Sequence, residues 1–84
     1  MKIVFAPNAL RELYSFQKKD QLFLQKKLSE LMEYENVLDH PKVKKLRLLP
    51  YYRYRAGDFR IFFDAEGNII TIYKISRRSE KTYR

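Results

Sequence analysis

The spacing of apolar residues divides the chain into a helical first part and an extended last part. After Pro7, apolar side chains recur at intervals of three, four and seven positions, which keeps them on one face of a helix. The pattern predicts two amphipathic helices, the first opened by Asn8 and the second capped by Asp20 and covering about residues 21–35. Their expected core positions are Leu10, Leu13 and Tyr14 in the first helix and Leu24, Leu28, Leu31 and Met32 in the second.

Extended segments flank these helices. Residues 2–6 are rich in β-branched and aromatic side chains and predict a first strand. From residue 51 onward polar and apolar residues alternate, as they do in half-buried strands. The expected strands cover residues 52–55, 58–64 and 68–75, joined by tight turns at Ala56-Gly57 and Glu66-Gly67.

These elements predict one α+β domain that covers residues 1–84. Its order is β-α-α-β-β-β, with a helical hairpin packed on one face of a small, mainly antiparallel sheet. Residues 36–50 are expected to form a loop or a short irregular element, because His40-Pro41 and Pro50 interrupt regular structure. The expected apolar anchors of this segment are Val43, Leu46 and Leu48.

Side-chain alternation gives the predicted sheet two different faces. The helix-facing side should hold Tyr52, Tyr54, Phe59, Ile61, Phe63, Ile70 and Ile72, and the other side Arg53, Arg55, Arg60, Phe62, Thr71 and Tyr73. With the expected turns, Arg53 lies opposite Arg60 and Arg55 lies opposite Asp58. Two opposed arginines destabilise a sheet, so this face is either a site for an anionic ligand or an ordinary solvated surface.

The distribution of charge favours an anionic partner. The 84 residues include 18 Lys and Arg against 10 Asp and Glu, a formal net charge of +8. Residues 37–63 contribute +5 and residues 64–84 contribute +2, so nearly all of the excess lies after the helices. Such a one-sided field is typical of proteins that bind nucleic acid, acidic proteins or anionic surfaces, although a solubilising surface is the simpler alternative.

The composition excludes several kinds of chemistry. There is no cysteine, and the two glycines both lie in predicted turns, so neither a thiolate nor a glycine-rich phosphate loop is available. A single histidine and scattered carboxylates predict no metal site and no cofactor. No apolar run is long enough for a membrane span, and residues 1–6 are too short for a signal peptide, so a cytoplasmic location is expected.

Arginine, lysine and tyrosine remain as the candidate chemistry. These side chains can promote metal-free phosphoryl transfer on RNA, because the ribose 2′-OH is itself the nucleophile. The aromatic residues among the arginines could stack on unpaired bases.

The run YRYRAGDFRIFFDAEGNIITIYKISRRSEKTY, residues 52–83, resembles the RelE/ParE superfamily of toxins from type II toxin–antitoxin systems. The family pattern is Tyr-Arg-x-Arg-x-Gly-Asp-Tyr/Phe-Arg, then a hairpin, an apolar strand and an arginine-containing tail that ends in tyrosine. The predicted element order also resembles this family, so the likeness covers nearly the whole chain. It implies a cognate antitoxin as partner. In the RelE branch the targets are the ribosome and its mRNA, which is cut without a metal, and in the ParE branch the target is DNA gyrase.

The resemblance, closer to the RelE branch, assigns roles to individual positions. It implies catalytic roles for Arg60, Arg77 and Tyr83. The residues expected to bind RNA are Arg53, Arg55, Lys44, Lys45, Tyr73 and Lys81. Arg53 and Arg55 stand where well-known RelE toxins have lysines, so the group that takes the 2′-OH proton is left open between Tyr83 and Lys81.

Three functions are consistent with these residues. The first is a ribosome-dependent mRNA endonuclease, the second a ParE-like gyrase inhibitor without nuclease activity, and the third a non-catalytic RNA-binding module.

Overall fold

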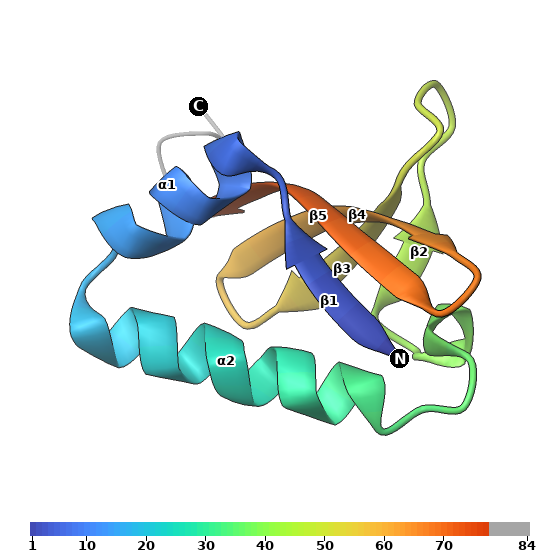
Figure 1. Cartoon of the computed structure of the whole chain (residues 1–84), viewed down its shortest axis with the longest axis horizontal. Helices are drawn as coiled ribbons and strands as arrows, with labels where there is room; N and C mark the ends of the chain where they lie inside the picture. The colour runs from blue at the N-terminus through green and yellow to red at the C-terminus, as the bar shows by residue number, and fades with distance from the viewer. Residues whose placement is uncertain (78–84) are drawn as a thin grey trace.

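The fold combines two helices with a five-stranded sheet. The structure, a computed structural model, describes residues 1–77. The elements in chain order are β1 (Lys2–Phe5), α1 (Pro7–Ser15), α2 (Lys18–Met32), the 3-10 turn η1 (Val37–Asp39), β2 (Val43–Lys45), β3 (Tyr52–Ala56), β4 (Phe59–Glu66) and β5 (Ile69–Arg77). Their arrangement is shown in Figure 1. The predicted α+β class is confirmed, while β2 and η1 were not expected as regular elements.

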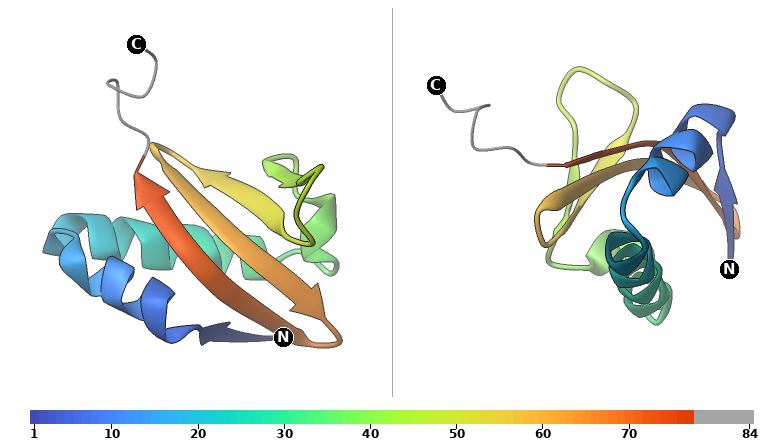
Figure 2. Two further views of the ribbon diagram at one scale, coloured as in Figure 1. Left: turned by 90° about the horizontal axis from the view of Figure 1, so that it is seen from above. Right: turned by 90° about the vertical axis from the view of Figure 1, so that its left-hand side faces the viewer.

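The strand order across the sheet is β1-β5-β4-β3-β2. β1 runs parallel to β5, and the other neighbouring strands are antiparallel. Both helices cover the same face of the sheet, and α2 lies beneath it, seen nearly end-on, in the right-hand view of Figure 2. The opposite side of the sheet is called the outer face below.

Both helices begin earlier than the sequence pattern predicts. Ala6 is the N-cap of α1 and Pro7 its first residue, because proline lacks the amide that would be unpaired there. The predicted cap Asn8 instead accepts a hydrogen bond from Arg11. In α2 the N-cap is Gln17, which puts Asp20 in the first turn rather than at the cap.

The core lies between the helices and the sheet. Its buried residues are Ala9, Leu13, Leu24, Leu28, Leu31, Val37, Tyr54, Ala56, Phe59, Ile61, Phe63, Ile70, Ile72 and Ile75. The predicted apolar stripe of α2 is confirmed, but of the three core positions predicted for α1 only Leu13 is buried, since Leu10 is 37% and Tyr14 66% exposed. Leu48, an expected anchor, is 96% exposed at the β2–β3 loop, while Val43 is half-buried.

The two hairpin turns differ from the predicted ones by one position. Each two-residue turn starts, rather than ends, with its glycine: Gly57 has φ +60° and Gly67 has φ +62°. No other residue of the described chain has positive φ. A two-residue turn in which only the first residue has positive φ is typical of type II′. Arg55 therefore pairs with Arg60, and the predicted pairs Arg53–Arg60 and Arg55–Asp58 are wrong. Moving each turn by one residue shifts the pairing between its two strands by two positions, which leaves every side chain on its predicted face.

A β-bulge interrupts the second hairpin. Phe63 pairs with Ile72, whereas Phe62 pairs with Lys74, so Tyr73 is an extra residue in β5. Beyond it the alternation of β5 is offset, and Ile75 is the next buried residue. The bulge shifts the register of β4 and β5 by one further position beyond Phe63, and no sequence signal marked it.

Two long-range hydrogen bonds attach the helices to the sheet. The Tyr54 hydroxyl donates to the Lys27 carbonyl of α2 at 3.0 Å. Burial raises the pKa of Tyr54 to about 12, so this hydroxyl stays protonated as a donor. The Ile75 amide donates to Glu12 Oε1 of α1 at 2.8 Å, beyond the point where β1 covers β5.

The turn glycines allow a matched test of packing at the β3–β4 corner. A Cβ on Gly57 would lie 2.8 Å from Phe23 Cζ, while a Cβ on Gly67 would meet nothing within 4 Å. Both Gly→Ala substitutions pay about 1–2 kcal/mol for positive φ. Urea denaturation should therefore find Gly57→Ala less stable than Gly67→Ala, by about 1 kcal/mol for moving the Phe23 ring. Equal losses in the two variants would contradict the close packing of Phe23.

Candidate nucleic-acid interface

Basic side chains line up across the outer face because of the strand register. Two rows of cross-strand neighbours form this surface: Lys44, Arg53, Phe62 and Lys74 in one, and Arg55, Arg60 and Ser76 in the next. Lys42 extends the second row, since its carbonyl accepts the Arg55 amide at 3.0 Å. Opposed side chains have Cβ atoms about 4.5–5.5 Å apart, so Arg55 and Arg60 bring two positive charges close together on this face.

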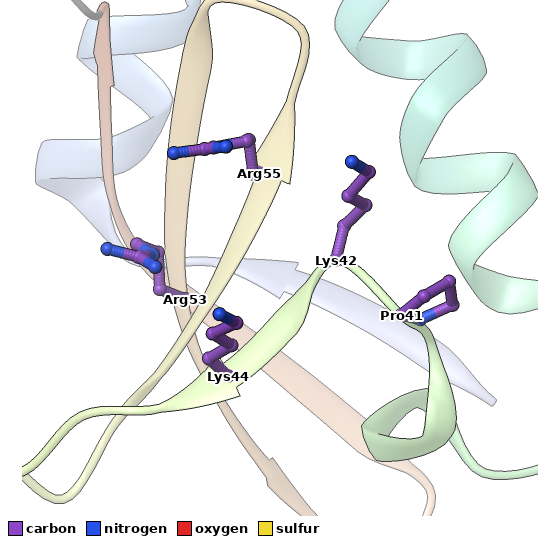
Figure 3. A pocket seen from close by; sticks show the side chains of 5 residues that line it. All are labelled: Pro41, Lys42, Lys44, Arg53 and Arg55. Atoms are coloured by element: carbon purple, nitrogen blue, oxygen red, sulfur yellow. The ribbon is translucent and has the colours of Figure 1, made fainter.

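Four of these cations surround a small pocket at the β2–β3 edge. This cationic pocket, of about 150 Å³, is lined by Pro41, Lys42, Lys44, Arg53 and Arg55. Figure 3 shows the four basic side chains on β2, on β3 and at Lys42, which directly precedes β2. Within residues 1–77 none of the four forms an ion pair, and the buried Arg53 Nε has no hydrogen-bond partner. An unsatisfied buried donor costs about 1–3 kcal/mol, so the pocket is not arranged for stability.

His40 holds the backbone at one side of the cationic pocket. Its Nδ1 accepts the Lys42 amide at 3.0 Å, and its ring lies between Tyr34 at 4.7 Å and Tyr54 at 5.0 Å. Burial, the main cause, lowers the pKa of His40 from its usual value of 6.5. The neutral ring can therefore accept this hydrogen bond at neutral pH, which gives the residue a positioning role.

A second pocket lies next to the arginine pair. This tyrosine pocket, of about 370 Å³, is lined by Leu49, Tyr51, Arg60, Phe62, Tyr73, Lys74 and Ser76. The rings of Tyr51 and Tyr73 are 4.8 Å apart with an interplanar angle of 39°. Tyr51 comes from the β2–β3 loop and Tyr73 from the bulge, so two irregular segments build this aromatic surface.

The far end of the outer face carries the opposite charge. Asp64 and Glu66 follow Arg60 and Phe62 along β4 and line a third pocket with Ile69, Thr71 and Tyr73. Tyr73 therefore marks the boundary between the basic and the acidic parts of the face. A polyanion would bind on one side of this boundary and be repelled on the other.

Not every predicted site residue lies on the basic part of the outer face. Arg53, Arg55, Lys44, Arg60 and Tyr73 are there together.

Lys45 lies elsewhere, with its Nζ 5.4 Å from the Tyr52 ring and 3.4 Å from the Leu49 carbonyl. Lys81 and Tyr83 lie outside the described residues, so their roles stay predictions.

Arg77 lies on the helix side of the sheet. It pairs with Phe59 across the strands, its guanidinium is 5.1 Å from the Phe59 ring, and its Nη1 is 3.0 Å from Asp20 Oδ2. Because β5 extends to Arg77, the expectation that this residue follows the last strand is wrong. Its predicted catalytic role would require the guanidinium to leave Asp20.

Three residues of the site were missed at the sequence level. Lys42 could have been found, because Lys42 and Lys44 alternate like strand residues that share a face. Lys74 reaches the tyrosine pocket through the bulge, and Tyr51 through a loop. Neither placement leaves a local signal in the sequence.

The basic part of the outer face can bind phosphates and stack on bases. Arginine presents a planar set of donors that matches phosphate oxygens, and tyrosine rings offer faces for stacking. Within residues 1–77 no three His, Cys, Asp or Glu side chains come together in a way that could hold a metal ion. None of the helices in this range has the length and apolar character to cross a membrane.

Comparison with known proteins identifies the class of the fold. The chain resembles the archaeal RelE–RelB complex from Pyrococcus horikoshii OT3, with 24% identity, coverage of 94% of this chain and 96% of that one, and a TM-score of 0.72. It also resembles the intact RelBE toxin–antitoxin complex of E. coli, with 20% identity, 93% and 96% coverage and a TM-score of 0.68. A YoeB/ParE toxin from Agrobacterium tumefaciens matches at 12% identity, with 94% and 100% coverage and a TM-score of 0.68. The fold is therefore that of RelE-like toxins.

Sequence comparison identifies the family. The family described as "ParE toxin of type II toxin-antitoxin system, parDE" matches residues 3–82. The chain belongs to this family and is a toxin of the RelE/ParE superfamily, which confirms the resemblance found in the sequence. No curated protein matches the chain.

The Arg77–Asp20 contact predicts a measurable contribution to stability. Arg77→Ala should lower the free energy of unfolding by about 1 kcal/mol, because it leaves the largely buried Asp20 without its partner. The pair is half-exposed on the arginine side, which limits the loss. Arg47→Ala, which removes an exposed arginine without an ion pair in residues 1–77, is the control and should change stability by less than about 0.5 kcal/mol. Identical urea midpoints for both variants would contradict a structural role for Arg77.

Proposed function

We propose that this protein is a ribosome-dependent mRNA endoribonuclease that arrests translation. The observation that carries the proposal is the cluster of Arg53, Arg55 and Arg60 on the outer face, with Arg55 directly opposite Arg60. Guanidinium groups gathered in this way present planar sets of donors that match the oxygens of a phosphate bound between them. The aromatic residues beside it suit unpaired RNA.

The reaction assigned to this face needs no metal. The 2′-oxygen of the RNA forms a bond to the adjacent phosphorus while the bond from phosphorus to the 5′-oxygen breaks. One proton leaves the 2′-OH and another reaches the 5′-oxygen, and extra negative charge develops on the phosphate oxygens. Arg60 extends from a central strand of the sheet, so its position is fixed before the charge develops. Arginine does not readily lose a proton, so Tyr83 or Lys81 is proposed for proton transfer.

The proposed partners are a cognate antitoxin, the ribosome and mRNA in the cytoplasm. An antitoxin segment with acidic and apolar residues would neutralise the cationic pocket and bury exposed apolar residues. Leu10 and Tyr14 on α1 provide such apolar surface outside the basic face. The solved RelE–RelB and RelBE complexes support this proposal, since those toxins are seen with their antitoxins.

A ParE-like function is the second candidate, because the matching family is that of ParE toxins. In this case the protein would inhibit DNA gyrase and leave mRNA intact. The arginine cluster would then bind a protein partner rather than promote phosphoryl transfer. A plain RNA-binding module, the third candidate, would neither cut mRNA nor inhibit gyrase.

Cleavage of mRNA on programmed ribosomes tests the main proposal. In single-turnover assays Arg60→Ala should cut about 10²–10³-fold more slowly than the wild type, because one preorganised donor to the developing charge is lost. Arg11→Ala, on the exposed surface of α1, removes the same charge and should leave the rate unchanged. Thermal unfolding of each variant checks that the core is intact.

The same assay separates the candidate functions. If the wild-type protein cuts no mRNA and inhibits gyrase supercoiling, the ParE-like function replaces the nuclease proposal. If neither effect occurs, RNA binding alone remains.

Binding to single-stranded RNA should depend steeply on salt. Each phosphate contact on a single strand adds about −0.7 to the slope of log K against log salt concentration. The double variant Arg53→Ala/Arg55→Ala should therefore have a slope less negative by about 1.4. Lys18→Ala/Lys19→Ala removes the same charge from an exposed part of α2 and should keep the wild-type slope. Fluorescence anisotropy with a labelled oligonucleotide measures the salt dependence of binding for both double variants. Equal slopes in the two variants would show that the RNA does not contact Arg53 and Arg55.

A further inference from the structure

We infer that the tyrosine pocket binds a single nucleobase of the RNA, with its phosphate between Arg60 and Lys74. The inference rests on the proposed action on RNA and assigns the site for base recognition within it. A pocket of about 370 Å³ lies in the lower range of sizes that hold small ligands, about 300–1,000 Å³. The adjacent cationic pocket has only about 150 Å³ and no aromatic lining, so it suits a phosphate but not a base.

The aromatic rings form a wall rather than a slot. Tyr51 and Tyr73 contact each other at 4.8 Å between ring centroids, which leaves no room for a base between them. Phe62 and Leu49 line the same pocket beside this ring pair. A flat base can therefore stack against the wall and bury its face among apolar groups, which is the usual sequence-tolerant way of holding an unpaired base.

The β-bulge brings the wall and a cation to the same place. In a regular strand, successive side chains face opposite sides of the sheet. Because Tyr73 is an extra residue, both Tyr73 and Lys74 line the tyrosine pocket. Bulges near functional sites commonly redirect a side chain in this way. Here a stacking surface and a positive charge lie one residue apart, as a nucleotide with its base and phosphate requires.

The polar groups of the pocket favour an anionic ligand with an aromatic part. Its charged residues, Arg60 and Lys74, are both basic, while Asp64 and Glu66 line only the neighbouring pocket beyond Tyr73. An acidic peptide could bind through the cations alone, without contacts to the tyrosine rings. The Arg55–Arg60 pair connects this pocket with the cationic pocket, so adjacent phosphates of one RNA strand can use both.

The β2–β3 loop is the part of the pocket that can vary without disturbing the sheet. It supplies Leu49 and Tyr51, and it is closed by a hydrogen bond from the Leu46 amide to the Tyr51 carbonyl at 3.0 Å. Lys45 Nζ, 3.4 Å from the Leu49 carbonyl, supports the same loop. The loop therefore supplies contacts to the base, and the strands supply the cations that bind the phosphate.

Nucleotide binding tests the inference without requiring cleavage. The full chain labelled with 15N is titrated with AMP and, separately, with ribose 5-phosphate, and amide shifts are followed by NMR. AMP should shift amides of Tyr51, Phe62 and Lys74 and bind more tightly than ribose 5-phosphate. Tyr51→Ala should weaken AMP binding by about 5- to 100-fold, the effect of losing one base–aromatic stack. Tyr51→Phe keeps the ring and should bind AMP as the wild type does.

Controls separate the base from the phosphate. Tyr51→Ala should leave ribose 5-phosphate binding unchanged, whereas Lys74→Ala should weaken both ligands. Leu49→Ser, at an exposed loop position, gives a second perturbation of the pocket with little risk to folding.

The inference is overturned if Tyr51→Ala binds AMP like the wild type, or if ribose 5-phosphate binds as tightly as AMP. It is also overturned if a hexaglutamate peptide shifts the same amides in a Tyr51-dependent way, since the pocket would then belong to a protein partner. Failure of the nuclease proposal is distinguishable, because AMP binding would persist in a protein that cuts no mRNA.

Discussion

The alternation of side chains along β4 connects the core of this toxin to its basic surface. Phe59, Ile61 and Phe63 are buried against the helices, and Arg60 and Phe62 alternate with them on the outer face. Any slip of this strand by one position would bury the arginine and expose the core residues. Burial of the apolar side therefore fixes the position of the charged side, so the same hydrophobic packing that stabilises the fold also holds Arg60 in the middle of the sheet.

The basic face opposes folding, and the rest of the molecule compensates for it. The buried Nε of Arg53, which has no hydrogen-bond partner within residues 1–77, raises the energy of the described structure. The compensation comes from the other side of the sheet, where Tyr54 is bonded to α2 and Glu12 to β5. Local conflicts of this kind are expected where a surface is selected for binding rather than for stability.

The sequence predicted the fold class, the helices and the residues on each face, because these depend on periodicity. Tyr54 and Arg55 lie on opposite faces of the sheet whichever residues form the turn. Their predicted faces were therefore correct, although their predicted pairing partners were wrong. Register and bulge were mispredicted because they depend on turn geometry and on contacts between strands. The bulge, at which the pairing changes from Phe63–Ile72 to Phe62–Lys74, has no signal in the local composition. Tyr51 reaches the site only through the tertiary packing of a loop.

The charge gradient of the outer face restricts how an RNA strand could lie on it. Cations extend from Lys42 at the β2 edge to Lys74 on β5, whereas Asp64 and Glu66 occupy the opposite end of β4. A strand that crossed β3 and β4 near Arg60 would meet cations and then the Tyr51–Tyr73 wall, but one that continued along β4 toward Glu66 would meet carboxylates. In the proposed complex, repulsion from these carboxylates would limit the bound segment to a few nucleotides, held by phosphates at one end and by a stacked base at the other. A short footprint of this kind would suit the proposed action on mRNA that the ribosome already holds.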